Sequence, residues 1–287
     1  MKSDDVNISV HVGGSGPALV FLHGYPQNHM CWQGIAPAFT RDFTCIVPDL
    51  RGYGDSDAPF DDSANHATYS KRQMALDLVA VLDHFGHDRA HVLGHDRGGR
   101  VAYRFALDHP ERLSRLGIIE IVPTGDFWQS WNAELAYNAY HWTFLAQPHP
   151  LPENMINANP VAYIDHTLKS WVNAKSLDVF PEAALESYRA QARDPAHIHA
   201  MCADYRAGAT FDRALDDADR AAGRKIAAPL RFLWAEGGFP GQTGDPAALW
   251  RNWANDVSDR SCVSGHFVME ENPEAVLDCF GAFFRSD

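Results

Sequence analysis

"GHDRGGR", residues 94–100, has the spacing of the G-x-S-x-G turn, but Asp96 stands at its centre where that motif has serine. In such a turn a strand ends abruptly and a helix begins, so the central side chain projects above a parallel sheet. The flanking sequence fits this arrangement, with a strand pattern over 90–96 and a helix pattern over 98–110. The stretch therefore predicts a carboxylate in the position of a nucleophile, with Arg97 and Arg100 beside it.

The chain around this turn alternates between strand-like and helix-like segments. Continuous apolar runs, typical of strands buried on both faces of a parallel sheet, occupy residues 18–24, 43–50, 116–123 and 229–236. One helix is expected after Ser70, which can form a capping box with Gln73, and the last helix begins at Pro273. This alternation predicts an α/β-hydrolase type of α/β fold, with a mostly parallel sheet flanked by helices.

The alternation is interrupted in the middle of the chain. Residues 124–210 are rich in Trp, Tyr, His, Asn and Pro, and they show helical periodicity without a convincing strand. We therefore expect a core domain formed by residues 1–123 and 211–287, with a helical cap subdomain inserted at 124–210.

The bulk composition limits the partners and the compartment. The formal net charge of −13 argues against nucleic acid or an anionic membrane as a partner, and it means that any anion site must be built from local cations. The five cysteines are odd in number and lack zinc-site spacing, which is typical of a reducing compartment. The start of the sequence has no signal-peptide core, and no later run is long enough to span a bilayer, so a cytoplasmic location is expected.

A carboxylate nucleophile suits displacement at a saturated carbon, because it forms an ester there that water can hydrolyse. Hydrolysis needs a base to activate the water. His266, in the SGHF segment after the last predicted strand, has the right side chain and follows the nucleophile in chain order. We therefore expect Asp96 to be the nucleophile and His266 the base.

The base needs an acid to orient it, and the sequence offers two places. After the strand ending in LWAE the chain has Gly238 where an aspartate could be expected. Glu120 instead interrupts the apolar run IIEIV, where an unpaired carboxylate would be costly to bury. Glu120 is the preferred orienting acid, and Asp126 and Glu236 are the alternatives.

The tetrahedral intermediate of ester hydrolysis also needs an oxyanion hole. HGYP (23–26) follows a predicted strand, so the backbone N–H of Tyr25 can join that of Arg97, directly after the nucleophile. No metal-binding cluster or dinucleotide motif is found, so no metal and no cofactor are expected.

Over essentially its whole length the sequence resembles the α/β-hydrolase superfamily and, within it, the fluoroacetate (haloacetate) dehalogenases. The resemblance rests on HGYPQNHMCW, DLRGYGDSD, GHDRGGRVAYRFALDHP, YHWTFLAQPHPLPE and SGHF. It implies that Arg97 and Arg100 bind the carboxylate of a small anionic haloacid, for which guanidinium geometry is suited. Such an enzyme would convert haloacetate, fluoroacetate above all, to glycolate and halide through an aspartyl ester.

The resemblance also implies roles for residues of the cap. His141, Trp142 and Tyr205 would donate hydrogen bonds to the departing halide, and Trp171 would line the pocket. The family pattern has aspartate at the orienting-acid position, where this chain has Glu120. Many relatives are dimers, so a homodimer is a further expectation.

Other functions remain open on the sequence alone. An epoxide hydrolase would use the same Asp, His and acid machinery, but it more often has Trp after the nucleophile and two tyrosines in its cap. Here Arg97 follows Asp96 and Tyr205 is the clearer donor, with Tyr163 and Tyr188 unplaced. A haloalkane dehalogenase fits less well because it needs Trp at position 97, and a non-catalytic receptor has no need of a regenerating base.

Overall fold

The computed structural model describes residues 1–61 and 63–286. Within these residues one seven-stranded sheet has the order β3-β5-β4-β6-β7-β8-β9. The strands are β3 (Val10–Gly14), β4 (Ala18–Leu22), β5 (Thr44–Pro48), β6 (Ala90–His95), β7 (Leu113–Ile119), β8 (Leu230–Ala235) and β9 (Val257–Cys262). The edge strand β3 runs antiparallel to β5, and the other neighbouring strands pair in parallel.

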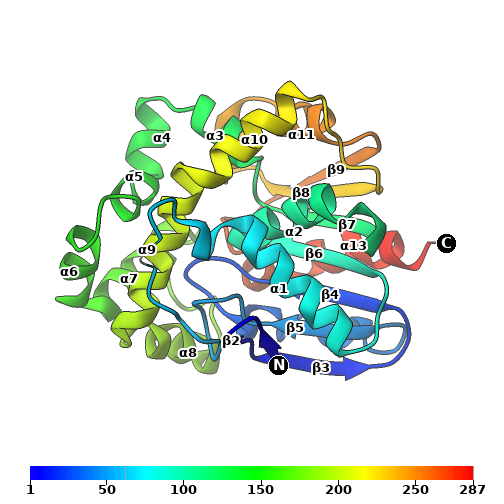
Figure 1. Cartoon of the computed structure of the whole chain (residues 1–287), viewed down its shortest axis with the longest axis horizontal. Helices are drawn as coiled ribbons and strands as arrows, with labels where there is room; N and C mark the ends of the chain where they lie inside the picture. Colours follow the sequence, from blue (N-terminus) through cyan, green and yellow to red (C-terminus); the bar gives the residue numbers. More distant parts are fainter. Residues whose placement is uncertain (62, 287) are drawn as a thin grey trace.

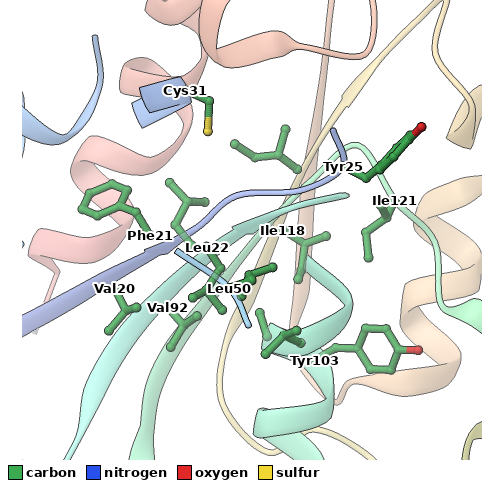
Figure 2. Close-up of a cluster of buried hydrophobic side chains, with 14 of the residues drawn as sticks. Val20, Phe21, Leu22, Tyr25, Cys31, Leu50, Val92, Tyr103, Ile118 and Ile121 are labelled. Carbon is green, nitrogen blue, oxygen red and sulfur yellow. The ribbon is translucent and has the colours of Figure 1, made fainter. Parts of the chain in front are cut away.

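The central strands are buried because their side chains are apolar on both faces. All five residues of β4 are buried. In Figure 2, Val20, Phe21 and Leu22 of β4 lie beside Val92 of β6 and Ile118 of β7. The strands that carry the site at their carboxyl ends are therefore held within the core.

Helices cover both faces of the sheet. In Figure 1, α1 (Lys71–His84) and α2 (Asp96–Asp108) lie in front of the strands, and α13 (Pro273–Arg285) lies behind them. The predicted cap of α1 is present, since Ser70 Oγ accepts the backbone N–H of Gln73 at 3.2 Å. The remaining core helices are α11 (Pro246–Trp253) and α12 (Val268–Glu271), and the short 3₁₀ helices are η1 (His29–Trp32), η2 (Ala36–Phe39), η3 (Ala67–Tyr69), η4 (Pro110–Arg112) and η5 (Pro240–Thr243).

A group of consecutive helices separates β7 from β8 in the chain, and most of it projects from one side of the sheet (Figure 1). Its members are α3 (Thr124–Gln129), α4 (Ala133–Asn138), α5 (His141–Leu145), α6 (Leu151–Asn157), α7 (Pro160–Trp171), α8 (Glu182–Ala192), α9 (Pro195–Ala209) and α10 (Phe211–Ala221). This insertion follows β7, which ends at the carboxyl edge of the sheet. It therefore stands above the elbow at Asp96.

The structure corrects two sequence expectations. Glu120 does not lie inside a strand: β7 ends at Ile119, and Glu120 follows with a positive φ of 60°. The edge strand β3 and the short hairpin of β1 (Lys2–Ser3) and β2 (Val6–Asn7) carried no apolar run that would have predicted them.

In the part of the chain that the structure describes, no helix has both the length and the apolar character that crossing a bilayer requires. The same residues contain no disulfide, and four of the five cysteines are buried.

Candidate active site

The elbow is built as the sequence predicted. Asp96 stands at the junction of β6 and α2 with a positive φ of 47°, a conformation that is strained for a residue with a side chain. The turn is tight enough that a Cβ at Gly98 would lie 2.3 Å from the carbonyl oxygen of His23. Glycine at this position therefore lets α2 approach β4, which fixes Asp96 at the carboxyl edge of the sheet.

Tyr25, one of the two predicted oxyanion-hole donors, contacts Asp96, the predicted nucleophile, through its backbone. Its N–H donates to Asp96 Oδ1 at 2.8 Å. The two carboxylate oxygens of Asp96 therefore have different surroundings. Oδ1 accepts from Tyr25, whereas Oδ2 lies 3.8 Å from His266 Nε2. The second expected donor, the N–H of Arg97, lies in the same turn and remains a prediction.

His266 lies between the predicted nucleophile and the predicted acid. Its Nδ1 is 3.9 Å from Glu120 Oε1, and its own backbone N–H donates to the carbonyl oxygen of Trp171 at 3.0 Å. The carbonyl oxygen of His266 accepts a hydrogen bond from His95 Nε2 at 2.9 Å. The loop that carries the histidine is thereby tied to both the cap and the elbow strand.

Glu120 is the acid that the structure brings to His266. Its Oε2 accepts the N–H of Ala235 at 2.7 Å, while Oε1 has no hydrogen-bond partner among the described residues. The two alternatives are engaged elsewhere: Asp126 pairs with Arg220 and accepts from Trp253, and Glu236 is exposed and bonded to Ser261.

Burial dominates the electrostatics of these three side chains. Burial lowers the pKa of His266 to about 3, so its ring is neutral at neutral pH and can accept a proton. Burial alone would raise the pKa of Asp96, but His266, His95 and the two arginines outweigh it and hold that pKa below its ordinary value. Burial raises the pKa of Glu120 well above its ordinary value, an effect that the Ala235 N–H opposes.

Arg97 is fully buried and held by Asp204 of α9. Its Nε donates to Asp204 Oδ2 at 3.0 Å, and its Nη2 donates to Oδ1 at 2.5 Å and to the backbone oxygen at 2.9 Å. The same carboxylate pairs with Lys71 and accepts from the Tyr53 hydroxyl at 2.9 Å. Arg97 Nη1 is left without a partner among the described residues.

Arg100 is held from the other side. Its Nη1 donates to the backbone oxygen of Val122 and to Thr124 Oγ1, each at 3.0 Å, and its guanidinium lies 4.6 Å from the ring centre of Trp142. Arg100 Nε has no partner among the described residues. The two arginines thus differ, because Arg97 is paired with a carboxylate and Arg100 contacts only neutral groups.

The predicted cap residues form an aromatic wall above Asp96. The ring of Tyr205 packs on Arg97 with its centre 4.3 Å from the guanidinium carbon, and it contacts the rings of His141 and Trp142. Trp171 packs against His141 with ring centres 4.3 Å apart. Burial lowers the pKa of His141 well below its ordinary value, so this ring is a neutral N–H donor.

Several of these groups line a narrow cavity of about 10 Å³, which is about the size of one water site. Its lining includes Asp96, Arg100, Glu120, His141, Trp142, Trp171 and His266, together with Ile121, Val122, Phe127, Phe239 and Pro240. A larger outer cavity shares Trp171, Phe239 and His266 with it and opens between the cap and the loop after β8.

Several buried polar atoms at this site have no partner among the described residues. They are Arg97 Nη1, Arg100 Nε, Glu120 Oε1, His141 Nδ1, the hydroxyls of Tyr25 and Tyr205, and both ring nitrogens of His266. Buried polar groups are normally hydrogen-bonded, so this concentration is typical of a site that binds a polar ligand.

Sequence reasoning missed part of this site. Asp204, Thr124, Phe127 and Phe239 were not singled out, and the signal that could have found Asp204 is an acid within the apolar helix segment AMCADY. Of the two tyrosines that the sequence left unplaced, Tyr188 has its hydroxyl bonded to Glu270, and Tyr163 is not part of the lining of the cavity.

Two side-chain groups outside this cavity have the composition of metal ligands. In the first, His149, Glu153 and His199, the guanidinium of Arg206 already donates to Glu153 Oε1 at 2.6 Å. In the second, His11, His29, Asp49 and Asp55, both carboxylate oxygens of Asp49 accept backbone N–H groups. Both groups are therefore accounted for by hydrogen bonds and ion pairs within the chain.

Comparisons with known proteins agree with the fold. The profile of the alpha/beta hydrolase fold family matches residues 17–184. The chain is 40% identical to a fluoroacetate dehalogenase of Burkholderia sp. over 94% of this chain and 88% of that protein, and 32% identical to a soluble epoxide hydrolase of Corynebacterium sp. over 94% and 91%. The crystal structure of ALR0039 from Nostoc sp. PCC 7120 superposes with a TM-score of 0.96 at 42% identity, covering 100% of this chain and 97% of that one.

These similarities confirm the expected fold and the resemblance to fluoroacetate dehalogenase, and they identify the protein as a hydrolase. The chain belongs to the α/β-hydrolase family.

Proposed function

We propose that this hydrolase cleaves the carbon–halogen bond of a haloacetate, fluoroacetate above all, and releases glycolate and halide. The observation that carries this proposal is a pair of buried guanidiniums near a buried carboxylate: Arg100 lines the narrow cavity together with Asp96, and Arg97 follows Asp96 directly in the chain. Each guanidinium retains a nitrogen without a partner among the described residues. A small carboxylate supplies the acceptors that these donors lack.

In the first step Asp96 Oδ2 attacks the α-carbon of the substrate, and the carbon–halogen bond breaks as the new carbon–oxygen bond forms. Arg97 and Arg100 hold the substrate carboxylate and thereby align the α-carbon with Oδ2. Halide leaves with the bonding electron pair toward the neutral donors of His141, Trp142 and Tyr205. Donors in a site with little water favour the departure even of fluoride, a poor leaving group.

In the second step water attacks the carbonyl carbon of the Asp96 ester while His266 Nε2 takes the proton. Negative charge develops on Oδ1, the oxygen that the Tyr25 N–H contacts. The histidine becomes a cation 3.9 Å from Glu120 Oε1, which favours the ionised form of that acid. Collapse of the intermediate breaks the bond between the Asp96 carbonyl carbon and Oδ2, and the departing glycolyl oxygen takes the proton from His266. Loss of the remaining proton to solvent regenerates the Asp96 carboxylate.

Epoxide hydrolysis by the same carboxylate, histidine and acid is the alternative. Ring opening would require donors to the epoxide oxygen, and Tyr205 contributes one unpaired hydroxyl at the aromatic wall. Tyr188 is a poorer candidate for the second cap tyrosine, because its hydroxyl is already bonded to Glu270 at 2.8 Å. The two arginines would also face a neutral substrate, for which they have no evident use.

Halide release from fluoroacetate and chloroacetate, with styrene oxide tested in parallel, decides between these functions. Fluoride and glycolate in equal amounts are the expected result. Chloride release alone would keep the mechanism and exclude fluoroacetate as the substrate. Diol formation from the epoxide without halide release would assign the chain to the epoxide hydrolases.

A further inference from the structure

The carboxylate of Glu120 fills the space beside the main chain of Gly238. A Cβ placed on Gly238 would lie 1.6 Å from Glu120 Oε1, 2.5 Å from Cδ and 2.9 Å from Oε2. Protein interiors are close-packed, so two groups cannot share this volume. Any side chain at position 238 must therefore displace the carboxylate.

The backbone of Gly238 does not itself require glycine. Gly244, farther along the same connection, has a positive φ of 99°, but Gly238 is not among the residues with positive φ. Glycine's conformational freedom thus explains position 244 and leaves position 238 unexplained. The requirement at position 238 is for space.

The end of β8 holds this carboxylate through Ala235, whose carbonyl oxygen also closes the turn at Gly238. Ala235 donates its N–H to Glu120 Oε2 at 2.7 Å, and Gly238 donates its N–H to the carbonyl oxygen of Ala235 at 3.0 Å. With Oε2 fixed in this way, Oε1 is the oxygen left near His266 Nδ1. A small displacement of Glu120 would therefore remove the acid that lies beside Nδ1 of the histidine, on the side away from Asp96.

We propose that Gly238 is a positioning residue for the Glu120–His266 pair, and that its missing side chain is what allows a glutamate at position 120 to serve as the orienting acid. The inference rests on the proposed function, in which Glu120 orients His266. An aspartate at position 120 is one methylene shorter and would not need the space beside Gly238. The residues at positions 120 and 238 are thus coupled.

The test compares Gly238→Ala, Glu120→Asp and the double variant, using chloroacetate and fluoroacetate as substrates. In Gly238→Ala the first halide released per site should persist while steady-state turnover falls by about 10²-fold, as expected when a catalytic group is misplaced by about 1 Å. The double variant should turn over faster than Gly238→Ala, because the shorter acid escapes the added methyl group. Its pH profile should return toward that of Glu120→Asp.

Gly237→Ala is the matched control. A Cβ on Gly237 would have its nearest contact at 3.8 Å, with the carbonyl oxygen of Ser264. This variant should keep wild-type turnover, which separates displacement of Glu120 from stiffening of the loop. Wild-type turnover in Gly238→Ala, or a double variant no faster than Gly238→Ala, would overturn the inference.

A second readout does not depend on the substrate. Nitrogen-15 NMR of labelled histidine, with His266 assigned by comparison with a His266→Gln variant, reports which ring nitrogen carries the proton. The Nδ1–H tautomer should predominate in the wild type, decrease in Gly238→Ala and recover in the double variant. If the wild type releases no halide yet the tautomer changes in this way, the proposed function fails and the positioning role stands; an unchanged tautomer in Gly238→Ala refutes the positioning role.

Discussion

Arg97 and Asp204 form an ion pair in which neither side chain has any exposed surface. Three hydrogen bonds from Arg97 to this one residue fix the guanidinium plane and leave Nη1 without a partner among the described residues. Burying an arginine requires compensation, and Asp204 supplies it while also pairing with Lys71. We therefore expect Asp204 to orient Arg97 and, at the same time, to neutralise part of the positive charge of Arg97.

Asp204→Asn should lower kcat without raising KM. The change removes one negative charge near an anionic substrate, which favours binding, but it frees Arg97 to leave the aligned position, and misalignment costs about 10²-fold in kcat at most. Steady-state kinetics with chloroacetate measure both constants. Asp212→Asn is the control, since Asp212 accepts the backbone N–H of Lys71 at 2.8 Å in the same buried region without a hydrogen bond to Arg97. A raised KM with unchanged kcat would contradict this account of Asp204.

Arg100→Leu should raise KM and lower kcat together, because Arg100 contacts only neutral groups and its charge is available to the substrate. We expect KM to rise about tenfold, which corresponds to a loss of about 1.4 kcal/mol of binding free energy. The KM and kcat of Arg100→Lys should lie between those of the wild type and those of Arg100→Leu, since lysine keeps the charge but not the planar pair of donors. Kinetics indistinguishable from wild type in Arg100→Leu would remove this residue from the site.

His266→Asn should release one halide per site and then stop. The first step needs only the carboxylate of Asp96, whereas hydrolysis of the ester needs a base. Mass spectrometry should find the protein carrying one glycolyl ester, located on Asp96 by peptide mapping. In the control Asp96→Asn no halide should be released, and repeated turnover by His266→Asn would exclude His266 as the base.

The sequence was most informative where one residue had to satisfy a single strong constraint. The continuous apolar runs at β4, β5 and β8 were typical of buried strands, and the glycines around Asp96 indicated a tight turn. Glu120 was recognisable because a carboxylate in an apolar run needs a partner, although its exact place after the strand depended on the end of the β7–β8 pairing at Ile119.

Other features depended on long-range packing, which one-dimensional periodicity does not encode. The pairing of Arg97 with Asp204 joins residues 107 positions apart, and either could have been solvated on its own helix. The edge strand β3 has a mixed burial pattern, so no alternation or apolar run predicted it. The same limit applies to Gly238, whose meaning became visible only when the carboxylate of Glu120 was found beside it.

Gly98→Ala should reduce the free energy of unfolding by about 3 kcal/mol, the upper end of the usual cost of overpacking. A Cβ at this position would lie 2.3 Å and 2.4 Å from the carbonyl oxygens of His23 and Leu22, so a backbone segment would have to move. Urea denaturation measures the difference. Gly34→Ala, at an exposed position with nothing within 4 Å of the added carbon, is the control. Equal stability of the two variants would refute the steric account of the elbow.

A half-buried carboxyl outside the cavity makes stability depend on pH. Glu270 accepts hydrogen bonds from Gln27 Nε2 and from the Tyr188 hydroxyl, each at 2.8 Å, and thereby connects the loop after β4, the cap helix α8 and α12. Burial raises the pKa of Glu270 from an ordinary 4.5 to about 8, and the neighbouring Glu271 adds to the rise. Between these two pH values the folded chain keeps a proton that the unfolded chain releases.

The contribution of Glu270 to the free energy of unfolding should therefore fall as pH rises from about 4.5 to about 8, by at most about 1.4 kcal/mol per pH unit. Glu270→Gln has no such proton, so its unfolding free energy should lack this contribution while keeping those of all other groups. Urea denaturation of both proteins at pH 5, 6.5 and 8 measures the difference between them, which should shift in favour of the variant as pH rises. Gln191→Ala is the control. Gln191 Nε2 donates to the carbonyl oxygen of Pro26 at 2.6 Å, so this variant also weakens the contact of α8 with the loop after β4. Because it leaves Glu270 in place, its unfolding free energy should change with pH as that of the wild type does. A difference between wild type and Glu270→Gln that stays constant with pH would mean that Glu270 is ionised in the folded protein.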